Sequence, residues 1–89
     1  MVETELLIRN QFGLHVRAAS KFVRIASKFK CEVLVSLDGI EVNGKSILGV
    51  MMLAAEMGST IKVKTVGTDE QEALNAIQAL VDGKFEGEP

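Results

Sequence analysis

The sequence predicts an α+β fold of two layers, an open-faced β-sandwich in which a four-stranded antiparallel sheet carries three helices on one face. Strand-like and helix-like segments follow one another along the 89 residues in the order β-α-β-β-α-β-α. Asp38-Gly39 separates the second and third strands, and this pair of residues is typical of a two-residue hairpin. The helical segments are amphipathic, so each has an apolar side to place against the sheet.

The first strand is predicted over Thr4–Arg9, which is rich in Leu and Ile and ends at the "NQFG" segment. A helix is predicted over Val16–Phe29 because apolar residues recur there with helical spacing. Its apolar stripe consists of Ala19, Phe22, Val23, Ala26 and Phe29. The opposite side carries a basic ridge of Arg17, Lys21, Arg24 and Lys28.

The second and third strands are predicted as a hairpin. Cys31–Leu37 alternates apolar and polar residues, as a half-buried strand does, and Ile40–Val42 continues the alternation after the turn. Asp38-Gly39 suits a type I′ turn, which needs positive φ at both central residues.

The second helix is predicted over Ile47–Met57, with Ser46 as its N-cap and Gly58 as its stop. Its core-facing residues would be Ile47, Val50, Leu53, Ala54 and Met57. Leu48, Met51 and Met52 are then left as an apolar surplus on the other side. Such a helix is either buried on all sides or presents a binding surface, and the small size of the chain favours a binding surface.

The fourth strand is predicted over Thr60–Val66, and a last helix follows a capping-box spacing between Thr68 and Gln71. The stripe of this helix consists of Ala73, Leu74, Ile77, Leu80 and Val81, and Gly83 closes it. The final six residues, "KFEGEP", are predicted to be a frayed tail.

The length predicts one domain over residues 1–89. The net charge of −2 argues against general binding of nucleic acid. The single cysteine, Cys31, cannot form an internal disulfide or a metal cage, and we expect it to be a small buried apolar residue. No metal site or cofactor is predicted. The absence of a signal peptide and of any apolar run of membrane-spanning length predicts a soluble, cytoplasmic protein.

The only histidine, His15, stands where the first helix begins. The first turn of a helix has unpaired N–H groups and partial positive charge, so it attracts anions and keeps an imidazole neutral and nucleophilic. If a phosphoryl group were attached to His15, the amides of Val16 and Arg17 and the Arg17 guanidinium could bind its oxygens. A histidine that merely caps the helix or lies on the surface is the alternative, and the residues alone leave both open. Similarly, Ser46 is most simply a cap, although a phosphate there would meet the same kind of amide site.

Two segments carry a resemblance to a known family. "FGLHVRAAS" resembles the phosphohistidine site of HPr, the histidine-containing phosphocarrier family of the phosphoenolpyruvate-dependent phosphotransferase system, and "NGKSILGVMML" resembles its regulatory-serine signature. The resemblance implies the strand order 1-4-2-3. It also implies that enzyme I phosphorylates His15 at Nδ1 with a phosphoryl group from phosphoenolpyruvate, that Arg17 stabilises this group, and that His15 passes it to an enzyme IIA domain for sugar uptake or regulation. Ser46 would be the site of the HPr kinase/phosphorylase.

The resemblance further implies a shared docking surface, with Leu14, Lys21, Arg24, Ile47, Leu48, Met51 and Met52 as partner-binding residues on a monomeric carrier without enzymatic turnover. The chain departs from the family at Ala18, where proline is usual, and at Val16, where alanine is commoner. These departures affect the expected partners more than the histidine chemistry. Two other functions remain open: a regulatory module that binds an enzyme or transcription regulator through the Ser46 helix without a phosphoryl relay, and a ligand-binding domain of the ferredoxin-like kind.

Overall fold

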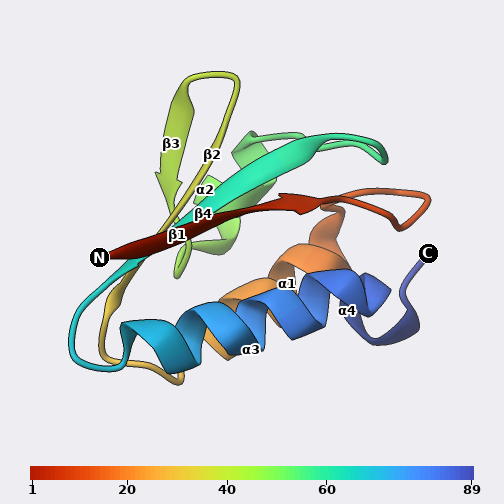
Figure 1. Ribbon diagram of the computed structural model, residues 1–89. Coiled ribbons are helices and arrows are strands. Elements are labelled where there is room, and N and C mark those ends of the chain that lie inside the picture. The colour runs from red at the N-terminus through yellow and green to blue at the C-terminus, as the bar shows by residue number, and fades with distance from the viewer.

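A computed structural model describes residues 1–89 and shows two layers, a sheet and a set of helices against it (Figure 1). The strands are β1 (Val2–Leu7), β2 (Glu32–Leu37), β3 (Ile40–Asn43) and β4 (Thr60–Val66). The helices are α1 (Val16–Ala26), α2 (Ile47–Met52), α3 (Glu70–Asp82) and α4 (Lys84–Gly87). The strand order is β1-β4-β2-β3 and all three pairings are antiparallel, so the predicted fold class and strand order are confirmed.

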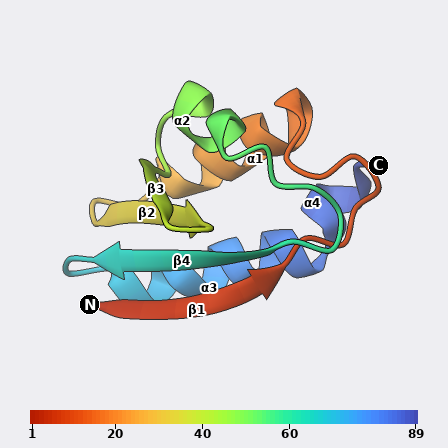
Figure 2. The same ribbon diagram turned by 90° about the horizontal axis from the view of Figure 1, so that it is seen from above.

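One core of 21 buried apolar residues lies between the sheet and the helices. Alternate residues of β4, among them Ile61 and Val63, point into it, as the two-residue period requires. The predicted stripe of α3 is buried in full: Ala73, Leu74, Ile77, Leu80 and Val81. Seen from above, β1 and β4 cross in front of α3, no helix covers the near face of these two strands, and α1 lies to the side next to α2 (Figure 2).

The Asp38-Gly39 hairpin is confirmed, with φ of 51° at Asp38 and 83° at Gly39. Several predicted boundaries shift. β1 covers Val2–Leu7 rather than Thr4–Arg9, and β2 begins one residue after Cys31. β3 ends at Asn43 rather than Val42, and α1 ends at Ala26 rather than Phe29.

The prediction for α2 is wrong, because the helix ends at Met52 and not at Met57. Ala54 adopts a φ of 50°, which leaves the helical path. The chain after it binds other segments: the Ala55 carbonyl accepts from the Leu14 amide at 2.9 Å, and the Gly58 amide donates to the Ile8 carbonyl at 2.8 Å. Because these backbone groups bond to the β1–α1 region, they are not available to extend the helix.

The start of α3 also differs from the prediction, since its N-cap is Asp69 and no side chain caps it. The Asp69 carboxylate instead accepts from the amides of Lys30 and Cys31, at 2.8 and 2.9 Å. These bonds, the Lys30 amide first, lower the pKa of Asp69. Asp69 therefore fastens the α1–β2 connection to the start of α3.

The C-terminal tail is ordered against the protein, which contradicts the prediction of a frayed end. Lys84, Phe85 and Glu86 have φ values of 56°, 54° and 63°, so the chain makes a left-handed turn after α3. This turn places the Phe85 side chain in the core, where it is 0% exposed. Figures 1 and 2 both show the C-terminal end beside the connection between β1 and α1.

Candidate functional site

His15 is the N-cap residue of α1, with extended backbone angles, and its side chain makes no capping hydrogen bond. No acidic residue lies in the first turn of the helix. The first-turn amides, including those of Val16 and Arg17, therefore have no side-chain cap and can accept an anion as a ligand. The alternative that the His15 side chain caps the helix is therefore wrong, whereas a histidine that simply lies on the surface stays open.

The two ring nitrogens of His15 lie in different surroundings. Nε2 is buried and has no hydrogen-bond partner, whereas Nδ1, which also forms no hydrogen bond, is not among the buried atoms. The Phe12 ring stands edge-on to the imidazole, with 6.3 Å between ring centroids and 83° between planes. Only Nδ1 is thus placed for a reaction with a partner at the surface.

The loop that carries His15 is tightly fixed by Gly13. Gly13 has a φ of 62°, and a Cβ built on it would lie 2.1 Å from the Ala55 carbonyl oxygen. Only glycine therefore permits this approach of the loop to the segment that follows α2. The next residue, Leu14, is 4% exposed and belongs to the core, so its predicted role as a partner-binding residue is corrected to one of packing.

Asn10 fixes the same loop from the other end. It is buried, and its Nδ2 donates to the Gly13 carbonyl at 2.7 Å and to the Pro89 backbone oxygen at 3.1 Å. Sequence reasoning had placed Asn10 only in a strand break, and the loop composition alone gives no sign of this contact.

A carboxylate from the tail reaches the basic ridge. Glu88 lies 3.2 Å from Arg17 Nε and 2.9 Å from Lys21 Nζ. Glu86 lies 3.4 Å from Lys21 Nζ. The hydrogen bond from Lys21, and then the charges of Arg17, Lys21 and His15, lower the pKa of Glu88, while burial opposes them. The bond to Glu88 in turn raises the pKa of Lys21.

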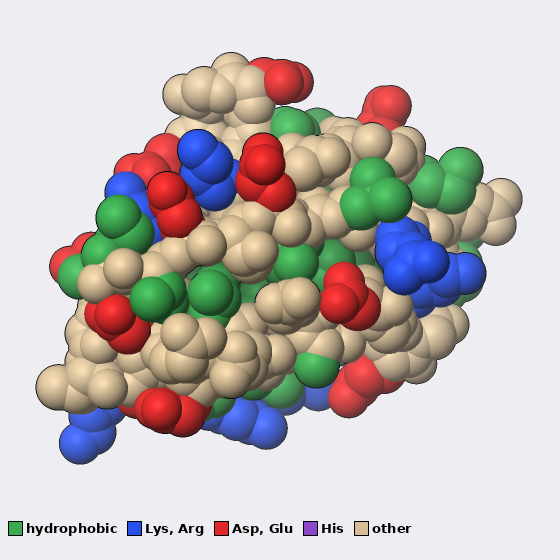
Figure 3. Space-filling model, viewed as in Figure 1, with side chains coloured by type: hydrophobic (Ala, Val, Ile, Leu, Met, Phe, Trp, Pro, Cys, Tyr) green, Lys and Arg blue, Asp and Glu red, His purple; other side chains and the backbone are tan.

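Half of the basic ridge is therefore neutralised within the chain, whereas Arg24 and Lys28 form no ion pair. Sequence reasoning missed Glu88 because it treated the tail as frayed. The one signal against fraying was Phe85, an apolar aromatic residue among Gly and Glu. On the face seen in Figure 3, acidic and basic side chains are interspersed.

Ser46 is the N-cap of α2, and its Oγ accepts from the Gly49 amide at 3.1 Å, as predicted. The apolar surplus of this helix is on the surface, where Leu48 is 74% and Met52 is 77% exposed. Met51 beside them is exposed too. Ile47, Ala54 and Met57 were predicted to face the core, and all three are exposed. Val50 and Leu53 alone are buried as predicted. The alternative of a fully buried helix is excluded.

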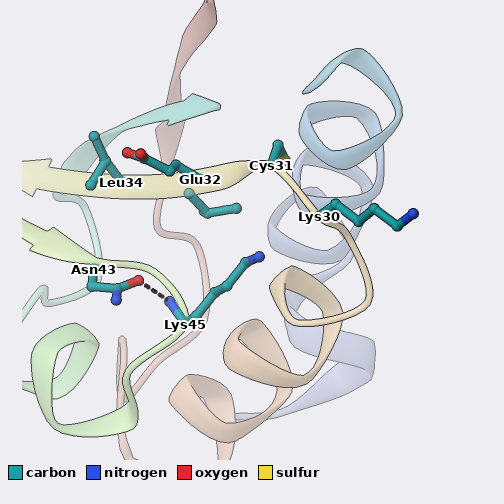
Figure 4. Close-up of a pocket in the computed structure, with 7 residues that line it drawn as sticks. Lys30, Cys31, Glu32, Leu34, Asn43 and Lys45 are labelled. Carbon is teal, nitrogen blue, oxygen red and sulfur yellow. Dashed lines mark hydrogen bonds between the residues drawn. The ribbon is translucent and has the colours of Figure 1, made fainter. Parts of the chain in front are cut away.

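The residue before Ser46 is held in place. Lys45 Nζ donates to the Phe29 carbonyl at 2.6 Å, and its amide donates to Asn43 Oδ1 at 2.9 Å (Figure 4). Asn43 and Lys45 border a hollow of about 260 Å³ beside the start of β2. The hollow lies beyond the C-terminal end of α1, about 16 Å of helix away from His15. Cys31, on its wall, is 3% exposed, and burial raises the pKa of its thiol.

His15 does not line any of the hollows of the molecule, so the site is a surface and not a pocket. The structure gathers no cluster of three metal-ligating side chains. None of its helices has the length and apolar character that crossing a membrane requires.

Comparison with known proteins bears on this surface. A family described as the PTS HPr component phosphorylation site matches residues 2–83, which leaves the tail of α4 outside the match. The phosphocarrier protein HPr of Neisseria meningitidis is 49% identical over 99% of this chain and 100% of its own length. The crystal structure of HPr from Thermoanaerobacter tengcongensis has a TM-score of 0.95 and 42% identity, covering all of both chains. A structure described as an HPr dimer from the same organism has a TM-score of 0.77 and 42% identity, over 96% of this chain and 98% of the other.

Proposed function

The chain belongs to the HPr family, the phosphocarriers of the phosphotransferase system, and from this we propose that it accepts a phosphoryl group on His15 Nδ1 from enzyme I and passes it to enzyme IIA domains. The observation that carries the proposal is the contrast between the two ring nitrogens, with Nε2 buried and Nδ1 accessible. A neutral ring with its proton on Nε2 presents the Nδ1 lone pair to a partner. The protein then serves as a phosphorylated substrate of other phosphotransferases and has no turnover of its own.

The transfer is balanced without a further reactant. The lone pair of Nδ1 forms a bond to phosphorus as the N–P bond of the donor phosphohistidine breaks, and the donor nitrogen keeps the electron pair of that bond. The donor ring, protonated on its other nitrogen, leaves as a neutral imidazole, and the His15 ring keeps its proton on Nε2. In the second transfer phospho-His15 is the donor, and a histidine of an enzyme IIA domain attacks the phosphorus in the same way. Negative charge develops on the phosphoryl oxygens beside the start of α1, where the amides of Val16 and Arg17 and the Arg17 guanidinium would stabilise it.

The docking surface in this proposal combines the exposed apolar residues of α2 with the free part of the basic ridge. It consists of Ile47, Leu48, Met51, Met52 and Arg24, while Lys21 takes part only to the extent that Glu88 and Glu86 leave it free. An apolar patch with an adjacent cation fits partners whose matching surface is apolar and acidic. Flexible methionines let one surface fit several partners in turn. We propose a single domain over residues 1–89 that acts as a monomer in the cytoplasm, so that the same face can meet each partner.

Ser46 is the proposed regulatory site, with an HPr kinase/phosphorylase as its partner. A phosphate on Ser46 would bring about −1.5 to −2 charges to the edge of the apolar patch, next to Ile47. Lys45 is bound to the Phe29 carbonyl and is not free to neutralise that charge. Phosphorylation of Ser46 should therefore weaken the docking of enzyme I.

A second function is supported by the position of this patch. Leu48 and Met52 are exposed whether or not His15 is modified, so α2 can bind a regulator without any relay. Mass analysis of the intact protein, after incubation with phosphoenolpyruvate and enzyme I, separates the two functions. The relay predicts one acid-labile phosphoryl group on the wild type and none on His15→Ala. No gain of mass, with an enzyme I that phosphorylates its own carrier, would favour the regulatory module.

The regulatory role of Ser46 has its own comparison. The rate of His15 phosphorylation by enzyme I should fall for Ser46→Asp and stay near that of the wild type for Ser46→Ala. Equal rates for the wild type and Ser46→Asp would contradict the role.

A further inference from the structure

The loop between β1 and α1 holds the only two buried side-chain atoms of the chain that have no hydrogen-bond partner. They are Asn10 Oδ1 and His15 Nε2. A buried polar atom without a partner is costly, and such atoms are rare in folded proteins. Two of them in one short loop indicate that a single partner serves both.

The orientation of the Asn10 amide is fixed by its neighbours. Asn10 is 1% exposed, and its Nδ2 donates to the Gly13 carbonyl at 2.7 Å and to the backbone oxygen of Pro89 at 3.1 Å. Both partners are acceptors only, so the two hydrogens of Nδ2 must face them and the amide cannot be turned round. Oδ1 is therefore a buried acceptor that needs a donor.

The Nε2 atom of His15 is the complementary group. A neutral imidazole carries one proton, and that proton is on Nε2 when the lone pair of Nδ1 is free to react. Nε2 is then a buried donor that needs an acceptor. If the proton were on Nδ1 instead, Asn10 Oδ1 and His15 Nε2 would both be acceptors, and neither could serve the other.

Phe12 is a neighbour of both residues. Its amide and Asn10 Nδ2 donate to the same Pro89 oxygen, at 3.0 and 3.1 Å. Its ring stands edge-on to the imidazole of His15, with 6.3 Å between the centroids. Asn10 and His15 form no direct hydrogen bond. A single water molecule fits as the shared partner, because it can donate to Oδ1 and accept from Nε2–H at the same time.

We propose that Asn10 is a positioning residue for His15: through one buried water molecule, its Oδ1 holds the proton of the ring on Nε2 and so presents the lone pair of Nδ1 to a partner. The inference deepens the relay proposed above, because this lone pair is the nucleophile of the relay. An acceptor behind a reacting or metal-binding histidine fixes the tautomer and the orientation of the ring in the same way. No covalent bond forms or breaks in this contact.

Two substitutions of Asn10 separate its acceptor from its part in fastening the loop. Both remove the Nδ2 bonds to Gly13 and Pro89, so both should lower the free energy of unfolding. Asn10→Ala also removes the acceptor, whereas Asn10→Asp keeps a carboxylate oxygen for the water molecule. Leu14→Ala is the control, because Leu14 is a core residue of the same loop, with 4% exposure, and its loss leaves Asn10 in place.

The first readout is the tautomer of the unmodified His15 ring. The nitrogen chemical shifts of Nδ1 and Nε2, measured by NMR at about pH 9, where histidine is neutral, report how the proton is divided between them. The ratio of the Nε2–H form to the Nδ1–H form should fall about twofold to tenfold in Asn10→Ala, as the loss of one hydrogen bond predicts. It should stay near the wild-type ratio in Asn10→Asp and Leu14→Ala. A purely structural role of Asn10 would lower stability in all three variants without this difference in tautomer.

The second readout needs no substitution. A crystal structure of the unmodified wild type should show one water molecule within about 3.2 Å of both Asn10 Oδ1 and His15 Nε2. The role of Asn10 is refuted if no such water is present, or if the wild-type ring carries its proton mainly on Nδ1. It is equally refuted if Asn10→Ala keeps the wild-type tautomer ratio.

Phosphorylation separates a failure of this inference from a failure of the relay. Phosphoramidate, a donor that needs no partner protein, should modify His15 at least about twofold more slowly in Asn10→Ala than in Asn10→Asp. Equal rates would overturn the role of Asn10 in transfer while the relay stands. If neither phosphoramidate nor enzyme I modifies wild-type His15, the relay is wrong, and the tautomer ratio alone decides whether Asn10 holds the ring.

Discussion

Replacing Gly13 by alanine should be among the most damaging single changes of a surface loop in this protein. Alanine at a φ of 62° adopts the left-handed region, which costs about 1–2 kcal/mol for a residue with a Cβ. Its Cβ would also lie 2.1 Å from the Ala55 carbonyl oxygen, a backbone atom that no side-chain rotation can remove. The loop must then shift and lose the Leu14–Ala55 hydrogen bond, which is typically worth about 0.5–1.5 kcal/mol. We expect a total loss of about 1.5–3.5 kcal/mol in the free energy of unfolding.

Gly39→Ala is the control, because Gly39 has a φ of 83° and no atom within 4 Å of the added Cβ. It carries the conformational cost without the clash. Urea denaturation at pH 7 measures both variants, and Gly13→Ala should lose about 0.5–1.5 kcal/mol more than Gly39→Ala, by the value of the lost hydrogen bond. A chain of this length has a total stability of roughly 4–13 kcal/mol, so the difference is easily measured. Equal losses would show that the loop relaxes freely, and the structural reason for glycine here would be wrong.

Three further predictions concern the tail, the α1–β2 connection and the docking surface. Phe85→Ala should lower the free energy of unfolding in urea by about 3–5 kcal/mol, because its ring is 0% exposed, whereas Phe12→Ala, with 63% exposure, should lose far less. A similarly small loss of unfolding free energy in both variants would show that the tail is frayed. The lowered pKa of Asp69 means that its carboxylate stabilises the fold above its ordinary pKa of 3.8, and that this contribution disappears as the pH falls through the lower folded value. Asp69→Asn should therefore be less stable than the wild type at pH 7 and approach it as the pH falls below 3.8, as thermal unfolding across pH would show. A constant gap at all pH values would contradict this. Leu48→Ala should change stability by less than about 0.5 kcal/mol and raise the KM of enzyme I for the protein with kcat unchanged, while Ile40→Ala, an exposed residue of the hairpin, should leave both constants unaltered.

The features that sequence reasoning found are those fixed by local chemistry. The stripe of α3 is readable because one face of a long helix must be apolar, and all five of its predicted residues are buried. The Asp38-Gly39 turn is readable because few residue pairs tolerate two positive φ angles in succession. His15 at the start of α1 and Ser46 at the start of α2 follow from the same kind of reasoning about helix ends.

The features that it missed depend on contacts between distant segments. α2 is short because the chain after it bonds to the β1–α1 loop, about forty residues away, through the Leu14 amide and the Ala55 carbonyl. The spacing of apolar residues over Ile47–Met57 cannot indicate such a contact. The Asp69 carboxylate accepts from an amide 38 residues away, and Asp69, not Thr68, is the N-cap residue of α3. The spacing of Thr68 and Gln71 gives no sign of this distant contact. Leu14 looked like a site residue because of its neighbours, but its own side chain completes the core.

The tail bears on the departure at Ala18 as well. Proline, which is usual at this position in the family, would stiffen the first turn of α1 by fixing φ, and alanine gives no such restraint. In this chain Ala18 is 0% exposed, so packing against the core holds its side chain in place. Glu88 supplies a second restraint, since it bridges Arg17 and Lys21 across one turn of the same helix. Proline would stiffen the first turn through its backbone, whereas in this chain Glu88 restrains the same turn through its contacts with two side chains of α1. On this reasoning, Ala18→Pro should add little stability to the wild type and more to Glu88→Gln. Equal effects in both backgrounds would show that Glu88 does not stiffen the first turn of α1.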